Sequence, residues 1–276
     1  MILLLGRHAF DRLWLEKDAL PFLPWAVERP LLSGRPLVVD FDDAWYLRYA
    51  GRPLLDGKLE ALAHRAETTI AGNETLAQWA GRAGANNIVQ LPTAVDPARY
   101  AGEPGSGATP PVVGWIGTPS SARDHLLPLA PLLAELVTAG RIQLTVVGAR
   151  LDLPATFLPW SEDGEADLVR GFDIGIMPLP DDAWSRGKCA YKLIQYLAAG
   201  LPVVASPVGM NCEVVEPGVN GSLAATPEAW REALTSLAAD PALRRRMGEA
   251  GRQLVKSSYA TKVVGSRLLT ILRNRS

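Results

Sequence analysis

The sequence predicts an α/β protein made of two Rossmann-like lobes, each with a parallel sheet. Three observations carry this prediction. Short apolar runs that suit buried strands alternate with segments of helical periodicity, which is typical of doubly wound sheets. Residues 101–111, mostly Gly, Pro, Ser and Ala without periodicity, indicate a linker between two such series. The length of 276 residues suits two small domains or one large one.

In the first half, the apolar runs predict strands over residues 2–5, 37–39, 68–71 and 87–91. Helical periodicity covers residues 54–66 and 74–83, and Asn73 is the expected cap of the second helix. Residues 7–35 are expected to be irregular, because Pro21, Pro24 and Pro30 rule out one long helix.

In the second half, the same patterns predict four or five parallel strands among residues 112–116, 142–147, 156–158, 173–177 and 203–205, with a short edge element over 222–224. Ser120 or Ser121 is the expected cap of a helix that runs to about residue 138. Further helices are expected over residues 165–170, from about 188 to 198, and over 227–238, 241–257 and 260–273.

The overall composition excludes several classes of protein. A net charge of −1 is not that of a nucleic-acid-binding protein. The two cysteines, Cys189 and Cys212, form no disulfide framework, and no CxxC or HExxH motif indicates zinc. The apolar start at residues 2–5 is too short for a signal peptide or a membrane span, so a cytoplasmic protein is expected.

The C-terminal end is basic, whereas the remainder of the chain is acidic. Residues 241–276 hold nine Lys and Arg residues and one acid, Glu249. Such helices either contact anionic lipid or a phosphorylated substrate, or present an ordinary solvated face.

Three carboxylates, Asp40, Asp42 and Asp43, follow the strand expected at residues 37–39. Ligands of open α/β sheets lie at the carboxyl ends of the strands. These side chains would therefore hold a metal or bind sugar hydroxyls, or they serve as turn and N-cap residues for the next helix. Both alternatives stay open, although no further metal ligand is identifiable.

The centre of the prediction is residues 187–213, which suggest a helix, a glycine turn, a buried strand and a small-residue loop ending in a carboxylate. Lys188, Lys192 and Gln195 are spaced i, i+4 and i+7, so they would share one helix face. Two cations at a helix N-terminus suit a diphosphate, while the alternative is a solvated lysine face. Gly117 and Thr118, between a strand and a helix, suit a second phosphate contact.

The segment DIGIMPLP and the run KLIQYLAAGLPVVASPVGMNCEVVEPGVNGSLA resemble the C-terminal lobe of group 1 (family 4 type) glycosyltransferases, which have the GT-B fold. The segments VVDFDDAW, AGNETLAQWA and NIVQLPTAVDPARY are similar to the end of the N-terminal lobe. The resemblance implies a shortened acceptor-side lobe over residues 1–103, a nucleotide-sugar-binding lobe over 111–258, and a helix over 259–276 that packs back toward the first lobe. The family's first lobe is usually longer, so the chain is expected to be truncated or reduced there.

The resemblance also assigns roles to individual positions. Gln195 stands where the family has the second of two glutamates and would bind the donor ribose, while Gly187 stands where the first is expected. Lys192 and Lys188 would face the diphosphate, and Glu213 would bind the donor sugar, so Lys192 and Glu213 are the expected catalytic residues. The other implied contacts fall into three groups. Gly117 and Thr118 would form the phosphate loop, with Arg123 near it. Trp160 and Pro178 would lie near the base, and Gly209 and Asn211 belong to the glycine loop.

The implied activity is transfer of a sugar from a nucleoside diphosphate to a glycan or lipid-linked acceptor, with retention and without a cofactor or metal. Such enzymes serve cell-envelope polysaccharide synthesis in the cytoplasm, here with peripheral contact to the inner face of the membrane through the basic C-terminal helices. Two alternatives stay open, a nucleotide-sugar-binding fragment of weak activity and a GT-B-fold nucleotide-sugar epimerase. A dinucleotide dehydrogenase is disfavoured because no GxGxxG follows a strand.

Overall fold

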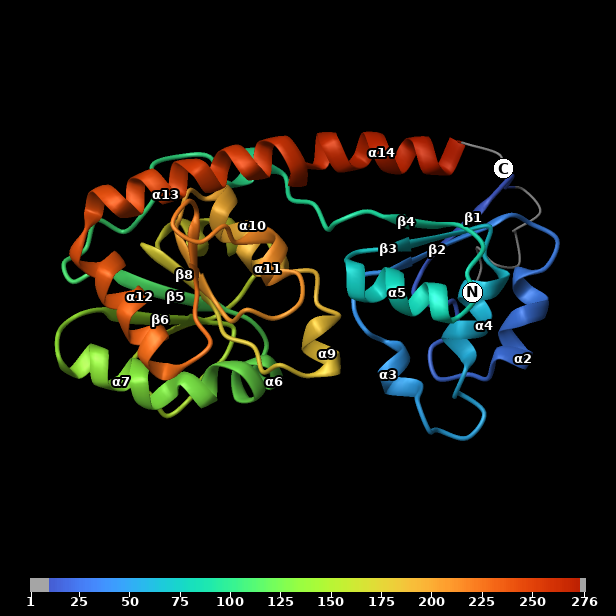
Figure 1. Ribbon diagram of the computed structural model, residues 1–276, viewed down its shortest axis with the longest axis horizontal. Coiled ribbons are helices and arrows are strands. Elements are labelled where there is room, and N and C mark those ends of the chain that lie inside the picture. The colour runs from blue at the N-terminus through green and yellow to red at the C-terminus, as the bar shows by residue number, and fades with distance from the viewer. Residues whose placement is uncertain (1–9, 274–276) are drawn as a thin grey trace. The chain divides into compact units, whose positions relative to one another are not determined.

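The computed structural model describes residues 10–273, and Figure 1 shows their secondary structure. The chain forms two compact units. The N-terminal unit comprises Met1–Thr93, Asp182–Cys189 and Val264–Ser276, and the C-terminal unit comprises Ala94–Asp181 and Ala190–Val263. The strand expected at residues 2–5 lies outside the described residues.

A parallel sheet forms the centre of the N-terminal unit, with its four strands in sequence order: β1 (Leu13–Glu16), β2 (Leu37–Phe41), β3 (Thr68–Ala71) and β4 (Ile88–Gln90). The strands expected at residues 37–39, 68–71 and 87–91 are confirmed. The expectation that residues 7–35 are irregular is wrong for β1. That strand buries only Leu13 completely, so it contains no apolar run that a sequence pattern would detect.

Short helices connect these strands. Helix α4 (Lys58–Arg65) begins later than the expected residue 54, because Leu54 has a left-handed backbone with φ of +67°. Helix α5 (Glu74–Arg82) starts as expected, since the Oδ1 of Asn73 accepts a hydrogen bond of 2.9 Å from the Leu76 N–H. The remaining helices of this unit are α2 (Trp25–Glu28), α3 (Tyr46–Tyr49), α9 (Ala183–Arg186) and most of α14 (Thr261–Arg273).

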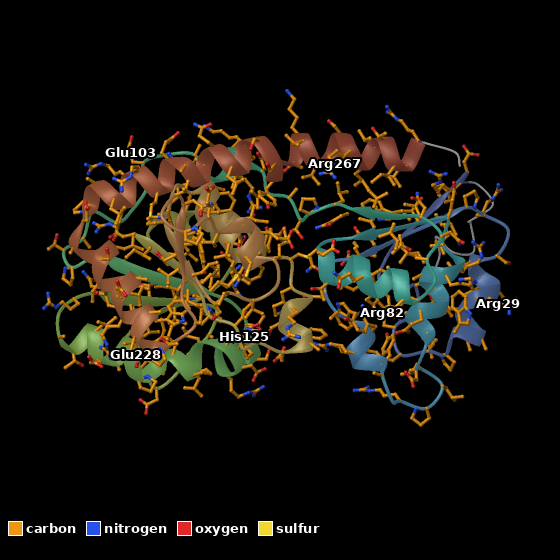
Figure 2. All side chains as sticks on the ribbon, in the orientation of Figure 1. Arg29, Arg82, Glu103, His125, Glu228 and Arg267 are labelled. Atoms are coloured by element: carbon orange, nitrogen blue, oxygen red, sulfur yellow. The ribbon has the colours of Figure 1, made fainter. Side chains whose placement is uncertain are left out.

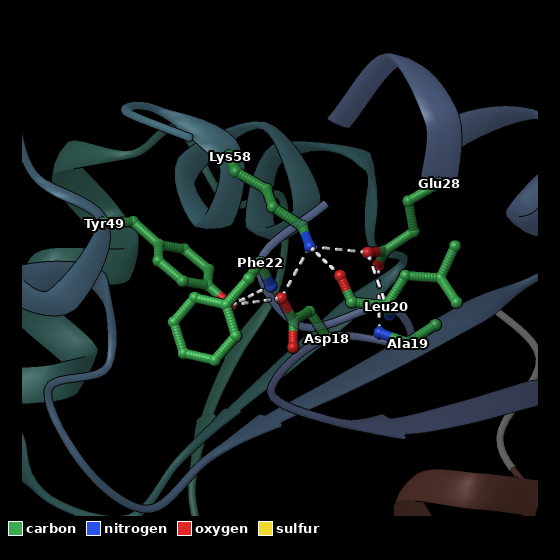
Figure 3. Close-up of polar contacts among 7 residues, drawn as sticks. All are labelled: Asp18, Ala19, Leu20, Phe22, Glu28, Tyr49 and Lys58. Carbon is green, nitrogen blue, oxygen red and sulfur yellow. Dashed lines mark hydrogen bonds and ion pairs between the residues drawn. The ribbon is translucent and has the colours of Figure 1, made fainter. Parts of the chain in front are cut away.

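A buried ion network fixes the segment between β1 and α2, as Figure 3 shows. The Nζ of Lys58 lies 2.6 Å from the Oδ2 of Asp18 and 2.8 Å from the Oε2 of Glu28. It also donates a hydrogen bond of 2.7 Å to the carbonyl of Leu20. Glu28 in turn accepts from the backbone N–H groups of Ala19 and Leu20. Because each charge in this interior has an opposite charge and hydrogen bonds, the cost of burying it is offset.

The C-terminal unit contains a six-stranded parallel sheet, in which the edge element expected at residues 222–224 forms the sixth strand. Its order is β10 (Gly221–Leu223), β9 (Val203–Ala205), β8 (Ile174–Met177), β5 (Val112–Ile116), β6 (Gln143–Val147) and β7 (Thr156–Leu158). The chain proceeds from β5 outward to β7, then returns to β8 beside β5 and proceeds outward to β10. The carboxyl ends of β5 and β8 therefore form a topological switch point, where ligands of open α/β sheets bind.

Helices cover both faces of this sheet. Helices α7 (Ala130–Thr138) and α12 (Pro227–Ala239) contribute leucines and Trp230 to a core with β5, β6 and β8. Figure 1 shows α10 (Tyr191–Ala198) and α13 (Pro241–Leu254) on the opposite side of the strands from α7. Helices α8 (Glu165–Arg170) and α11 (Asn211–Val214) lie in the connections.

The helix after β5 differs from the expected one. Its cap is Thr118, whose Oγ1 accepts from the Ser121 N–H at 3.3 Å, so the expected cap at Ser120 or Ser121 is wrong. The expected continuous helix is also interrupted, into α6 (Pro119–Ser121), a π-helical segment (Ala122–Leu126), a 3₁₀ turn (Leu127–Leu129) and α7. The interruption coincides with Pro128, which lacks the backbone N–H that an α-helix needs.

Candidate functional site

The carboxyl edge of the six-stranded sheet collects most of the candidate residues. Because all of its strands are parallel, the loops that leave them meet at one edge. Gly117 follows β5, Trp160 follows β7, and Pro178 follows β8, while the loop to Gly209 follows β9. The parallel strand order of the C-terminal unit thus brings these loops to one edge of the sheet, although their binding roles stay predictions.

Gly148, just after β6, allows two of these loops to approach closely. Its φ is +81°, and a Cβ on it would lie 2.5 Å from the carbonyl oxygen of Gly117. Gly117 donates its N–H to the carbonyl of Val147 at 3.0 Å. The loop after β5 therefore packs closely against the loop after β6, next to the switch point.

Lys192 lies at this switch point. It is in the first turn of α10, the second of the two helices between β8 and β9. Its Nζ is 5.1 Å from the ring centroid of Trp115 on β5, and its Cε would be 3.2 Å from a Cβ on Gly117. One cation, the first-turn amides of α10 and the Gly117 loop are thus brought together, which is an arrangement suited to an anion.

Lys188 does not share that helix face, so the expected stripe of Lys188, Lys192 and Gln195 is wrong in this part. Helix α10 begins only at Tyr191, after Ala190 with φ of +51°. Lys188 belongs to the N-terminal unit, where its Nζ is 3.8 Å from the Oδ1 of Asp43 and lies over the ring of Trp184. Its carbonyl accepts a hydrogen bond of 3.1 Å from Asn73.

Gly187 is required by packing within the N-terminal unit. A Cβ at this position would lie 2.6 Å from the Cβ of Ala44 and 3.0 Å from its backbone nitrogen. The absence of a glutamate here, where the resembling family has one, therefore has a local reason. A longer side chain would force apart the segment at residues 182–189 and the chain that follows β2.

We expect Gly187→Ala to lower the free energy of unfolding by about 1–3 kcal/mol, because the new methyl group meets backbone that cannot move aside freely. Urea titration followed by circular dichroism would measure the change. Gly265→Ala is the matched control, since nothing lies within 4 Å of a Cβ at Gly265 in helix α14. The control should be neutral or stabilising by up to about 1 kcal/mol, and an equal loss in both variants would contradict the packing explanation.

Gln195 is buried in a polar network that the sequence did not indicate. Its Nε2 donates to the hydroxyl of Tyr100 at 2.9 Å and to the Oε1 of Glu165. The other carboxylate oxygen of Glu165 accepts from the indole N–H of Trp160 at 2.7 Å. Glu165 thus ties two of the expected binding residues, Gln195 and Trp160, to one carboxylate. Gln195 is 30 residues from Glu165 and 95 residues from Tyr100 in the sequence, so no spacing pattern connects it to these partners.

A hollow of about 590 Å³ lies beside β6 and β7, and its lining includes the rings of Phe157 and Trp160. Trp160 is half exposed there, and Arg150 lies over the ring of Phe157 at 5.4 Å from its centroid. Pro178, the other residue expected near a base, is buried at the end of β8, and its neighbour Leu179 donates a backbone hydrogen bond to Ser206. The exposed ring of Trp160 could stack on a planar ring system in this hollow.

The remaining candidates differ in exposure. Arg123 is exposed and pairs with Asp124 at 3.2 Å. Asn211 is buried and donates to the carbonyl of Ser206 at 3.0 Å, so it supports the loop that contains Gly209. Glu213 is exposed in α11.

The carboxyl edge of the other sheet, in the N-terminal unit, carries the second cluster of charges. Burial, together with the negative charges of Asp42 and Glu16, raises the pKa of Asp40 to about 7. Burial also raises the pKa of Asp43, an effect that the charge of Lys188 opposes. Among residues 10–273, no His, Cys, Asp and Glu side chains gather in a group that would hold a metal ion, so the metal alternative for these aspartates has no structural support.

Comparison with known proteins identifies similar sequences. A family model described as glycosyl transferases group 1 matches residues 110–240. Phosphatidyl-myo-inositol mannosyltransferase from Mycobacterium leprae is 26% identical over 282 residues, which cover 95% of this chain and 73% of that protein. Spore coat protein SA from Bacillus subtilis is 32% identical over 78 residues, so the matched part is 27% of this chain and only 21% of the length of that relative.

Solved structures with the same fold include Anabaena Alr3699/HepE in complex with UDP and glucose. It has a TM-score of 0.76 at 17% sequence identity, and the match covers 99% of this chain and 80% of that one. This likeness extends over both units and shows that they have the fold of that protein.

Proposed function

The chain belongs to the group 1 glycosyltransferases of the GT-B fold, and on this premise we propose that it transfers a sugar from a nucleoside diphosphate donor to an acceptor, with retention at the anomeric carbon. The observation that carries the donor assignment is the position of Lys192, against Trp115 and Gly117 at the switch point between β5 and β8. A fixed cation, helix amides and a glycine loop at that point would contact a diphosphate.

The chemistry follows from the charge of the leaving group. The bond between the anomeric carbon and the diphosphate oxygen breaks through an oxocarbenium-like state, and negative charge grows on the diphosphate. Lys192 and the first-turn amides of α10 would stabilise that charge more in the transition state than in the bound donor. The diphosphate needs no proton from the protein to leave, and Glu213 would bind a hydroxyl of the donor sugar.

The other donor contacts are assigned by position. The hollow beside Trp160 and Arg150 would receive the base, with Pro178 beside the end of β8. Gln195 would reach the ribose through its Oε1, since its Nε2 already donates to Tyr100 and Glu165. The proposed phosphate loop is Gly117 and Thr118 with Arg123 near it, and Gly209 and Asn211 would shape the loop that presents Glu213.

We propose that the acceptor is a glycan or a lipid-linked sugar, and that the reaction takes place in the cytoplasm as part of cell-envelope polysaccharide synthesis. Within residues 10–273, no helix has the length and apolar character needed to cross a membrane. The basic helices α13 and α14 would supply peripheral contact with lipid. One cation of α14 already has a structural contact, since Arg267, visible in Figure 2, donates to the carbonyl of Gln90.

The decisive experiment is transfer of radiolabelled sugar from a panel of nucleoside diphosphate sugars, with and without membrane extract as a source of acceptor. We expect labelled product only when acceptor is present. Donor binding without transfer or donor hydrolysis would instead support a weakly active nucleotide-sugar-binding protein. That alternative is favoured by Gln195, because its Nε2 already donates to Tyr100 and Glu165. Conversion of the nucleotide sugar in the absence of acceptor would support an epimerase.

A further inference from the structure

The carboxylate of Glu165 joins two residues that are expected at the donor site. Glu165 is the first residue of α8. Its Oε1 accepts a hydrogen bond from the Nε2 of Gln195, and its Oε2 accepts from the indole N–H of Trp160 at 2.7 Å. All three residues belong to the C-terminal unit, so one compact unit fixes their arrangement.

The hydroxyl of Tyr100 closes this arrangement into a triangle. It accepts from the Nε2 of Gln195 at 2.9 Å and donates to the Oε1 of Glu165 at 3.4 Å. Tyr100 is 1% exposed, and this burial raises the pKa of Tyr100, so its hydroxyl keeps the proton at neutral pH. The donor and acceptor roles within the triangle are therefore fixed.

These roles determine how the amide of Gln195 is turned. An ionised carboxylate accepts hydrogen bonds and donates none, so the amide group that faces Glu165 must be the NH₂. One of its two protons goes to Tyr100 and the other to Glu165. Turning the amide over would place its Oε1 against the carboxylate with no proton between the two oxygens. Oε1 therefore takes no part in the triangle and can act only as an acceptor.

Gln195 shares a face of helix α10, labelled in Figure 1, with Lys192. The two residues are three positions apart, and side chains at that spacing are neighbours on a helix. A diphosphate bound at Lys192 would thus place its ribose beside Gln195. The ribose hydroxyls would donate to the fixed Oε1, whereas the turned amide would present N–H groups to them.

We propose that Glu165 is the positioning residue for the nucleoside part of the donor, because it holds the Gln195 amide in the one orientation that offers an acceptor to the ribose. The same carboxylate holds the ring of Trp160 through its indole N–H. This assignment rests on the proposed function, since it presupposes a nucleoside diphosphate. It further implies that Glu165 and Gln195 act as a pair, in which one member must be an amide and the other a carboxylate.

Calorimetric titration of the full chain with nucleoside diphosphates tests the assignment. The probes are UDP, GDP and ADP, each compared with its 2′,3′-dideoxy counterpart, which keeps the base and the diphosphate but lacks the ribose hydroxyls. With the base that binds most tightly, we expect the unmodified chain to prefer the ribonucleotide by about tenfold or more. The dideoxy form would leave the Oε1 of Gln195 without a donor.

In Glu165→Gln the preference for the ribonucleotide should fall to about twofold. The new amide has one acceptor oxygen for the donors of both Gln195 and Trp160, so either Trp160 loses its bond or the Gln195 amide turns over. Glu162→Gln is the matched control, because it makes the same chemical change at an exposed position between β7 and α8. The control should keep the full preference, and circular dichroism would check that both variants fold.

Exchanging the two groups separates positioning from a merely structural role. Gln195→Glu alone should weaken ribonucleotide binding by about tenfold, because two carboxylates would then face each other. Glu165→Gln/Gln195→Glu again pairs one amide with one carboxylate, so the affinity should return to within about threefold of the unmodified chain. In the transfer assay, Glu165→Gln should raise KM for the donor and leave kcat within about twofold, since this contact is the same in the bound donor and the transition state.

The binding measurements need no sugar transfer, so the assignment and the proposed activity can fail separately. Equal losses for the ribonucleotide and its dideoxy counterpart in Glu165→Gln would overturn the positioning role while donor binding stands. A double variant that binds no better than the weaker single variant, or an unmodified chain that does not distinguish the two ligands, would overturn it as well. If the unmodified chain binds none of the three diphosphates, the proposed donor falls together with the role of Glu165.

Discussion

Replacing Lys58 by methionine is expected to lower the free energy of unfolding by about 3–5 kcal/mol. The substitution keeps the length of the side chain but removes the only cation that contacts both Asp18 and Glu28 among the described residues. Two carboxylates would then be buried without a partner charge. Urea denaturation of the full chain, with hydrogen exchange over residues 13–93 to localise the loss, would measure the effect.

The pH dependence provides an independent check on this mechanism. Burial alone lowers the pKa of Lys58, but the hydrogen bonds and charges of Asp18 and Glu28 outweigh it, so the pKa is raised above its ordinary value. A raised pKa in the folded state means that this stabilisation is present below the unfolded pKa, about 10.4, and is lost as pH rises through the folded value. The unmodified chain should therefore keep this contribution at neutral pH and lose it only in alkaline solution.

In Lys58→Met the lost stability comes from two buried carboxylates that no longer have a partner cation. Adding Asp18→Asn and Glu28→Gln to Lys58→Met should restore part of the lost free energy of unfolding at neutral pH. Lys256→Met, at an exposed lysine, is the control. A loss below about 1 kcal/mol in Lys58→Met, or the same loss in the control, would contradict a stabilising role for the network.

The sequence predicted the two parallel sheets well because their strands are buried on both faces. Such strands appear as continuous apolar runs, as in β2, β5 and β8, and do not depend on knowing their neighbours. Strand β1 lacks that signal, since its positions alternate between buried and exposed, and it was not found. The cap at Asn73 was predicted correctly, but the cap at Thr118 was not, because several neighbouring hydroxyls near a helix start do not reveal which one accepts the hydrogen bond.

The sequence predicted which loops carry the candidate residues, but it did not predict which side chains these residues contact. Lys188 fits the helical spacing, yet Asn73 binds its carbonyl from 115 residues away and the helix starts after it. Likewise Glu165 joins Gln195 and Trp160 through bonds that only the fold creates. Periodicity reports which face of one element a residue occupies, whereas these contacts depend on how separate elements pack.

Lys192→Ala is expected to reduce kcat by a factor of about 10²–10³, the loss typical of removing one preorganised donor from a developing negative charge. The ammonium group rests over the ring of Trp115, so it is held in place before the donor binds, and no reorganisation is needed when the diphosphate begins to leave. Because this stabilisation is larger in the transition state than in the bound donor, we expect the affinity for the intact nucleoside diphosphate sugar to change much less than kcat.

Initial rates of sugar transfer, measured beside calorimetric titration with the nucleoside diphosphate sugar in the absence of acceptor, would separate the two quantities. Lys192→Arg keeps a cation at the switch point and should retain more activity than Lys192→Ala, although the wider guanidinium will not sit on Trp115 in the same way. Lys256→Ala, at an exposed lysine of the C-terminal unit, should leave both quantities unchanged. If kcat of Lys192→Ala stays within about twofold while binding weakens strongly, Lys192 contributes to uniform binding of the donor and the leaving diphosphate must be stabilised by the amides of α10 and the Gly117 loop.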